Sequence, residues 1–470
     1  MGTDDKPRVA YIWSQELQDV SDDLPSNIGR SSMVHGLIKA LDLLDDDAAD
    51  NRPANGVDNP TNKATVFAPD EDLGSEQCLL KYHDQSYIDA LMKYRATSPP
   101  SYDPTAPRDT SSTSSQPPPA KRARTKGPNL QEYRDMDVYN LSHDNPPFPK
   151  LPRYITLVAA ATSTACRLLV QDEADFVICW DGGRHHAKKS EAGGFCYVND
   201  LVLGLLLLSR EGKVPMPSDQ RNKKNGRTKT RPPRIIYLDL DLHYSDGVSS
   251  AFHSTKEYPD PMPTKNPPKP PSVMTFSIHH SAMGFYPPAT PWAELTNSWL
   301  PTPFSLSVPL AAYPSSKTYK TVWEGCVEPI VKEWDPDYIV LQLGSDGLPG
   351  DRVGQFGNWS VEEEGGMKWC IEKVEKWGKK TCVTGGGGYN HPNTARAWAA
   401  VTASLLDRPI NGETPIPHHE HFEEYAHSFT MEVPQGHMED QNKRRYLDQA
   451  CEDFGYISTR IKDIVASSPR

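Results

Sequence analysis

The chain has 470 residues, a formal net charge of −12, 44 prolines and 8 cysteines. The negative charge argues against a general nucleic-acid binder and favours basic partners such as lysine-rich protein tails. The longest aliphatic run, residues 201–208, is far shorter than the ~20 apolar residues of a membrane span, and no signal peptide is recognisable. We therefore expect a soluble intracellular protein. Because the cysteines form no CxxC pair, we also expect reduced thiols, without disulfides or a cysteine zinc site.

Proline-rich, serine-rich and basic stretches interrupt the apolar pattern of the chain. They cover residues 97–130, 211–234 and 257–272, and their composition buries too little apolar surface to order itself. We expect flexible insertions there. The rest predicts a single catalytic domain over residues 8–455, followed by a tail over residues 456–470.

The first insertion contains the sequence PPPAKRARTKG. Its basic side chains are similar to a nuclear import signal, although exposed basic clusters of other kinds look alike. They belong to Lys121, Arg122, Arg124 and Lys126. We therefore expect nuclear residence, with the cytoplasm as the alternative.

Between the insertions, short apolar runs alternate with stretches of helical period. The runs predict strands over residues 175–180, 235–240, 273–278, 337–344 and 380–384, and the periodic stretches predict helices over residues 153–170, 200–210, 319–334, 361–377 and 394–406. This rhythm is typical of an α/β protein with an open, doubly wound and mostly parallel sheet covered by helices on both faces.

Each predicted strand ends in polar or glycine-rich sequence. The segments that follow them are DGGRHHAKKSEAGGFCYVND, DLHYSDG, HH, SDGLPGDR and GGGGYN. Open parallel sheets bind ligands beyond the carboxyl ends of their strands, so these segments predict an active site at that edge. Solvated loops would explain one or two of the segments but not all of them.

The stretch RIIYLDLDLHYSDGV predicts a metal site. Side chains alternate along a strand, so Asp239, Asp241 and His243 share one side of it. The alternative is a half-exposed strand whose polar side meets water. Buried together, these groups need a cation, and Asp346 offers a further carboxylate from another strand end. Asp241, His243 and Asp346 would give a metal three protein ligands and leave the fourth position open for water, as in catalytic zinc sites. The same ligands would also suit Fe(II) or Mn(II).

The neighbouring pair His185 and His186 is a candidate for acid–base chemistry. Such histidines need a carboxylate on the second ring nitrogen, and we assign Asp239 to His185 and Asp246 to His186. The alternative is a pair of surface histidines in a loop.

Tyr389 follows a run of glycines that lets the backbone pass close to a ligand. Its phenol is a candidate donor to a developing oxyanion, against the alternative of a core tyrosine.

Four segments together resemble the motifs of the class I zinc-dependent histone deacetylases. They are RHHAKKSEAGGFCYVND, YLDLDLHYSDGV, LQLGSDGLPGDR and GGGGYNHPNTARAW, and the likeness extends through most of residues 8–455. The segment GRSSMVHGLIKAL is more similar to the stand-alone branch than to the corepressor-bound members. The resemblance implies an arginase/deacetylase-like fold and hydrolysis of N-ε-acetyl-lysine in proteins such as histones, with a role in chromatin and transcription regulation.

The resemblance also implies roles for single residues. Asp241, His243 and Asp346 would bind zinc, His186 would be general base and then acid, His185 would support it electrostatically, and Tyr389 would polarise the acetyl carbonyl. Asp144, Gly194, Phe195, Tyr286 and Leu348 would bind substrate. Structural potassium ions would lie at Asp239, Asp241, His243, Ser277 and Ile278, and at a peripheral site that includes Phe252 and Val273.

The chain departs from the family pattern at two places. Tyr244 and Ser245 stand where the family usually has His-Gly, which questions the local loop geometry. Pro392 replaces an arginine that corepressor-bound members use for inositol phosphate, although Arg352 is present, so we expect no inositol phosphate corepressor complex. Deacetylation of acetylpolyamines or of non-histone acyl-lysine, arginase-like hydrolysis and non-catalytic binding of acetyl-lysine are the alternatives.

Overall fold

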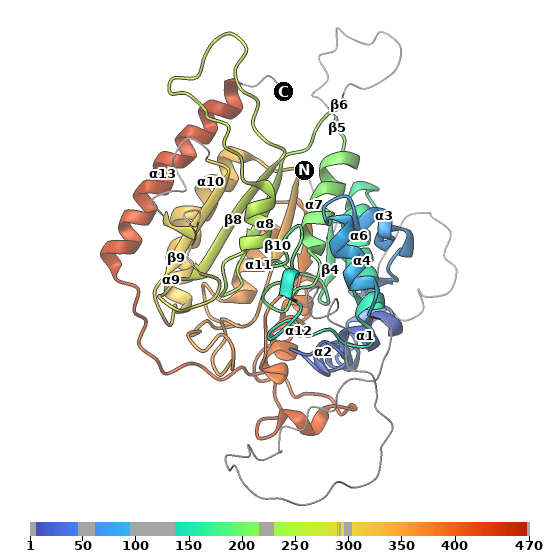
Figure 1. Ribbon diagram of the computed structural model, residues 1–470. Helices are drawn as coiled ribbons and strands as arrows, with labels where there is room; N and C mark the ends of the chain where they lie inside the picture. Colours follow the sequence, from blue (N-terminus) through green and yellow to red (C-terminus); the bar gives the residue numbers. More distant parts are fainter. Residues whose placement is uncertain are drawn as a thin grey trace, which may run out of the picture.

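The computed structural model describes residues 6–45, 62–94, 137–215, 230–288, 290, 293–295 and 303–467. Its centre is a nine-stranded sheet in the order β2-β3-β1-β4-β11-β10-β7-β8-β9, in which every pairing is parallel (Figure 1). In that order the strands are Leu44–Asp45, Ala64–Phe67, Val9–Ile12, Phe176–Cys179, Lys380–Thr384, Tyr338–Gln342, Ile235–Asp239, Val273–His280 and Ser305–Leu310. The predicted open parallel α/β fold is confirmed.

Helices cover both faces of the sheet and bury a hydrophobic core on each (Figure 1). One face carries α2 (Arg30–Ala40), α9 (Ser316–Val322), α10 (Glu328–Trp334), α11 (Met367–Lys376), α12 (His391–Leu405), η6 (Phe422–Tyr425) and α13 (Arg444–Ser467). The other carries α1 (Gln15–Ser21), η2 (Glu71–Gly74), α3 (Glu76–Leu79), α4 (Gln85–Met92), α6 (Leu151–Val170), α7 (Asp200–Glu211) and α8 (Asp246–Phe252).

Strand β7 is buried on both sides, so the half-exposed strand considered from the sequence is wrong. Ile236 and Leu238 belong to one core, and Ile235 and Tyr237 belong to the other. Asp239, the last residue of β7, is also fully buried. Its carboxylate therefore needs partners inside the protein rather than water.

Two helices differ from the sequence prediction for an identifiable reason. The helix predicted from residue 361 begins only at Met367, because Gly365 takes a φ of 88° that a helix does not contain. The helix predicted over residues 319–334 begins at Ser316 and includes a π-turn, η5 (Trp323–Val327). Pro329 has no N–H to bond the carbonyl of Gly325, which accounts for this local change of hydrogen bonding.

The expected tail over residues 456–470 is largely helical and packed, which corrects the sequence prediction. Helix α13 continues to Ser467, and Ile457, Ile461 and Ile464 are buried in the core. The ring of Phe454 lies 5.2 Å from that of Phe276 on β8. These apolar residues recur at helical spacing, but the charged residues between them hid the pattern.

The three expected insertions are described to different extents. Residues 97–130, with the basic cluster, lie outside the described part of the chain. The insertion over residues 211–234 is described at its ends, where β5 (Val214–Pro215) and β6 (Thr230–Arg231) pair antiparallel. Residues 257–272 contain no helix or strand. None of the described helices has the length and hydropathy required to cross a membrane.

The third insertion is attached to α13. The guanidinium group of Arg460 donates hydrogen bonds to the carbonyls of Tyr258 and Pro259, at 3.0 and 2.9 Å. The ring of Tyr258 is buried and lies 5.1 Å from that of Phe304. Helix α13 therefore holds this insertion as well as covering the core.

Replacing Ile461 by alanine should lower the free energy of unfolding by about 2–5 kcal/mol, because the fully buried side chain leaves a cavity. Lys462→Ala is the matched control, since its exposed side chain should change stability by only about 0.5 kcal/mol. Denaturant titration of the full chain measures both. Equal effects of the two substitutions would show that α13 does not pack against the core.

Candidate active site

Asp241, His243 and Asp346 meet at the carboxyl edge of the sheet. Asp241 and His243 follow β7, and Asp346 follows the adjacent strand β10. One nitrogen or oxygen of each side chain lies within 4.8 Å of the others, and all three side chains are buried. The His243 Nδ1 atom is 2.7 Å from Asp346 Oδ2 and 3.3 Å from Asp241 Oδ1.

The charges of this cluster fit a cation. Burial alone lowers the pKa of His243, but the carboxylates of Asp346 and Asp241 offset this and raise it to about 10. Burial together with the charge of Asp241 raises the pKa of Asp346 to about 7. The carboxylates thus attract positive charge to the point where the three side chains converge. Two carboxylates and one imidazole are a donor set for zinc and for several other divalent metals.

Backbone groups hold the carboxylates in place. Asp241 Oδ2 accepts a hydrogen bond of 2.7 Å from the Gly387 N–H, and Asp346 Oδ1 accepts one of 3.0 Å from the Leu242 N–H. A Cβ atom on Gly387 would lie only 2.5 Å from Asp346 Oδ2. The GGGGYN segment therefore requires glycine here because its backbone touches the cluster.

Two histidines beside the cluster are each held by a carboxylate. His185 Nδ1 lies 2.8 Å from Asp239 Oδ2, and His186 Nδ1 lies 2.8 Å from Asp246 Oδ1. These are the pairings that the sequence analysis assigned. With Nδ1 bound to a carboxylate, each imidazole keeps Nε2 for another partner. The ring centroid of His186 is 6.0 Å from that of His243, so this second nitrogen is close to the cluster.

The two imidazoles have opposite protonation tendencies. Burial lowers the pKa of His185, but the charges of Asp239 and Asp241 more than compensate and raise it to about 9. Burial and the charge of His185 lower the pKa of His186 to about 4. The ring centroids of the pair are 3.9 Å apart. At neutral pH His186 is therefore the neutral member, which is the state that can accept a proton.

Tyr389 lies next to the same carboxylates. Burial raises the pKa of its phenol well above the ordinary value, and the charges of Asp346 and Asp241 add to this. Its backbone N–H donates a 2.6 Å hydrogen bond to Asp351. A phenol that stays protonated in this position can donate a hydrogen bond to an anionic oxygen.

Arg30 is a buried neighbour that sequence reasoning missed. Its guanidinium group donates hydrogen bonds of 2.9 and 3.1 Å to the carbonyls of Gly386 and Gly388, and it lies over the ring of Trp398. It thereby supports the backbone that presents Tyr389. No sequence signal links Arg30 to a segment more than 350 residues away.

Aromatic side chains surround the approach to the cluster. The Tyr286 ring centroid is 4.9 Å from that of His186, and the Phe195 ring centroid is 5.5 Å from that of Tyr389. Phe285, which the sequence analysis did not select, stacks on His243 at 4.8 Å. Its position beside Tyr286 in the sequence was the only available signal.

The other expected substrate residues are placed differently. A Cβ on Gly194 would lie 2.2 Å from His186 Cδ2, so only glycine fits there. Asp144 is exposed. Burial is the main cause that raises the pKa of Tyr286 above its ordinary value, and the charge of Asp144 adds to it. Leu348 is buried and belongs to the hydrophobic core on the α9–α13 face of the sheet.

The departure at Tyr244 and Ser245 leaves the cluster intact. The Tyr244 ring is buried and lies 4.7 Å from that of His279, while Ser245 directly precedes α8. Both flanking groups keep their partners, since His243 still faces Asp346 and Asp246 still bonds His186.

The expected potassium residues include several oxygen donors that lie close together. Asp239 pairs with Ser277 in the register of β7 and β8, and the Ser277 hydroxyl lies 3.1 Å from His279 Nδ1. Ile278 is buried within β8, while Phe252 ends α8 and Val273 begins β8.

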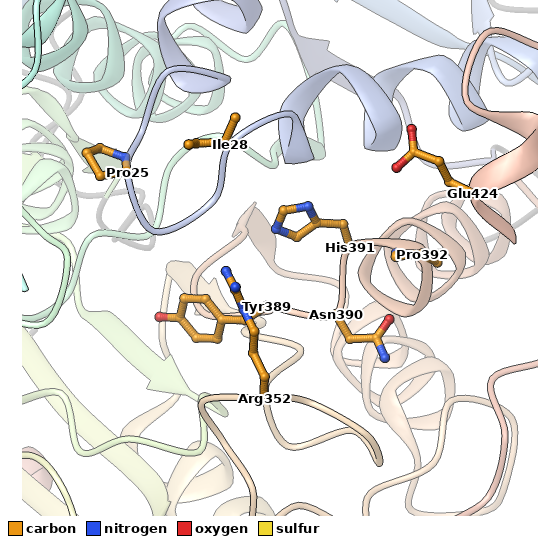
Figure 2. A pocket seen from close by; sticks show the side chains of 8 residues that line it. All are labelled: Pro25, Ile28, Arg352, Tyr389, Asn390, His391, Pro392 and Glu424. Carbon is orange, nitrogen blue, oxygen red and sulfur yellow. The ribbon is translucent and has the colours of Figure 1, made fainter. Parts of the chain in front are cut away.

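A cavity of about 430 Å³ opens beside Tyr389 (Figure 2). Figure 2 shows the phenol of Tyr389 pointing away from Glu424 on the opposite wall. One Arg352 nitrogen donates a 3.0 Å hydrogen bond to the Ser26 carbonyl, which connects two walls of the cavity. The lining residues are Pro25, Ile28, Arg352, Tyr389, Asn390, His391, Pro392 and Glu424.

Comparisons with known proteins identify the family of this chain. The histone deacetylase domain family matches residues 52–405. Histone deacetylase 8 of Xenopus tropicalis is 29% identical over 97% of this chain and 98% of its own length. Histone deacetylase 9 of Arabidopsis thaliana is 33% identical over 69% of this chain and 67% of its own, and histone deacetylase 8 of Xenopus laevis is 33% identical over 70% and 87%. The family resemblance inferred from the sequence motifs is confirmed, and the chain belongs to the histone deacetylase family of hydrolases.

Proposed function

We propose that this histone deacetylase hydrolyses N-ε-acetyl-lysine in proteins such as histones, with a zinc ion held by Asp241, His243 and Asp346. The observation that carries the proposal is the convergence of these ligands with the neutral imidazole of His186 and the phenol of Tyr389 at one edge of the sheet. A binding protein without activity would not need a carboxylate-held base beside the cluster. Iron(II) remains the alternative metal for the same donor set.

The chain's own groups account for the proton transfers. His186 accepts a proton from water through Nε2 as the water oxygen attacks the amide carbon, and Asp246 stabilises the imidazolium through Nδ1. Tyr389 donates a hydrogen bond to the oxyanion that forms. His186 then returns the proton to the lysine nitrogen, the C–N bond breaks, and acetate and lysine leave. When bound, zinc supplies Lewis acidity toward the water and the carbonyl.

The surroundings support a long, narrow substrate side chain. The ring of Tyr286 lies beside His186 and the ring of Phe195 lies beside Tyr389, and such aromatic neighbours suit an alkyl chain ending in an amide. We propose that Asp144, which is exposed near Tyr286, binds backbone amides of a peptide at the entrance. Potassium ions at the Asp239–Ser277 region and near Phe252 and Val273 are part of the proposal.

A role in chromatin and transcription regulation in the nucleus completes the proposal, which draws on the family membership and on the basic cluster at residues 121–126. We further propose that the enzyme acts without an inositol phosphate corepressor complex. The carboxylate of Glu424 and the ring of Pro392 line the cavity that contains Arg352, and an acidic group there disfavours a polyanion.

Asp346→Asn should release the metal and abolish activity, because it removes one charged ligand. Asp246→Asn is the matched control, since this carboxylate holds His186 and does not belong to the cluster. It should retain the metal and lose about 10²- to 10⁴-fold in turnover of an acetylated peptide. Elemental analysis with a deacetylation assay distinguishes the two. Full metal content in Asp346→Asn would contradict the ligand assignment.

Tyr389→Phe should reduce turnover by about 10²- to 10³-fold, because the oxyanion loses one hydrogen-bond donor. Metal content and the melting temperature should stay the same. Tyr425→Phe, which removes another buried phenol outside the cluster, is the control and should keep its turnover. Equal rates for wild type and Tyr389→Phe would refute the oxyanion role.

Gly194→Ala should displace His186 and lower activity at least tenfold, because the new Cβ would lie 2.2 Å from the imidazole. Gly378→Ala is the matched control. Both glycines have positive φ, at 50° and 61°, so both substitutions strain the backbone, but Gly378 has open space around it. Steady-state kinetics and thermal melts measure the two effects. An equal loss of activity in both variants would mean that strain, and not contact with His186, is responsible.

A further inference from the structure

The described cysteines include two pairs of thiols in hydrogen-bonding contact. Cys451 of α13 contacts Cys326 of the π-turn η5, and Cys166 of α6 contacts Cys382 of β11. All four thiols are free, and none belongs to the candidate active site. The pairs differ in one respect that decides their chemistry, which is access to solvent.

The contact between Cys451 and η5 is very close. A Cβ atom on Gly325 would lie 2.1 Å from the Cys451 Sγ and 3.7 Å from its Cα. The same sulfur lies 3.8 Å from the carbonyl of Thr321. Only a glycine at position 325 lets α13 approach the π-turn this closely, and the approach brings the Cys451 sulfur to the Cys326 thiol.

Access to the two pairs is unequal. Cys451 is half-buried, while its partner Cys326 is fully buried. Cys166 and Cys382 are both completely buried and cannot be reached without opening the core. The hydrogen bond from Cys326 also lowers the pKa of Cys451 to about 7, against the opposing effects of partial burial and the charge of Asp448. The hydrogen bond from Cys326 thus favours the thiolate of Cys451, which is the form that reacts with oxidants.

We propose that Cys451 and Cys326 form a peroxide-reactive thiol pair that closes to a disulfide between α13 and the π-turn. The Cys451 thiolate attacks one oxygen of a hydroperoxide, the O–O bond breaks, and a sulfenic acid forms with release of water or an alcohol. The Cys326 thiol then attacks the Cys451 sulfur, and the hydroxyl leaves as a second water. Two thiols are oxidised by two electrons and the peroxide is reduced by two, so no further reagent is required.

The disulfide would link α13 covalently to η5, which is more than 100 residues earlier in the chain. Helix α13 covers hydrophobic residues and holds the third insertion through Arg460. A cross-link that closes a long loop restricts the unfolded chain and slows release of the helix. The pair is thus a modification site that stabilises the C-terminal helix under oxidising conditions.

The test treats the reduced full-length protein with a tenfold excess of hydrogen peroxide, blocks the remaining thiols by alkylation and analyses non-reduced peptides by mass spectrometry. We expect a linked peptide that contains Cys326 and Cys451, with Cys166 and Cys382 still alkylated as thiols. The melting temperature should rise by roughly 3–5 °C and return after reduction.

Single variants separate the two steps. In Cys326→Ser, dimedone should trap a sulfenic acid on Cys451 and the melting temperature should not rise. In Cys451→Ser, Cys326 should stay reduced because peroxide cannot reach it. Wild-type protein in which Cys326 and Cys451 both remain free thiols after treatment would overturn the proposal, as would equal oxidation of the buried pair.

Discussion

The arrangement of the active site depends on the repulsion between carboxylates that have been taken out of water. Asp241 and Asp346 are buried at the ends of adjacent strands, and Asp239 is buried just before them. Such a group of charges is unstable unless positive charge and hydrogen-bond donors are placed among them. The imidazole of His243 and the backbone N–H groups of Gly387 and Leu242 provide part of this compensation. A divalent cation held by Asp241, His243 and Asp346 would supply the rest.

The same electrostatic constraint sets the character of the groups around the cluster. Asp239 and Asp241 keep His185 protonated, and the resulting charge helps to keep His186 neutral. The negative charges also keep the phenol of Tyr389 protonated. A neutral base and a protonated donor are the states that amide hydrolysis requires at the start of the reaction. The protonation pattern follows from the positions of the carboxylates and needs no separate adjustment.

Sequence alone predicted much of this because the relevant information is local. The alternation of the LDLDLH segment pointed to Asp241 and His243, which directly follow β7, and the parallel topology brought Asp346 and Tyr389 to the same edge. Long-range packing was not predictable in this way. Arg30, for example, reaches the glycine segment only through the folded chain.

The C-terminal helix α13 is a second case in which long-range packing could not be predicted from the sequence. The apolar residues of α13 recur at helical spacing, yet the high charge between them favoured a tail, because the composition of a segment does not reveal which surface is available to cover it. That surface is created by α9, η5, α10 and β8, which are distant from α13 in the sequence. Gly325 is essential to it, since any side chain there would collide with Cys451. A close helix contact that needs glycine on one side also brings two thiols together, so packing and thiol chemistry at this place have one cause.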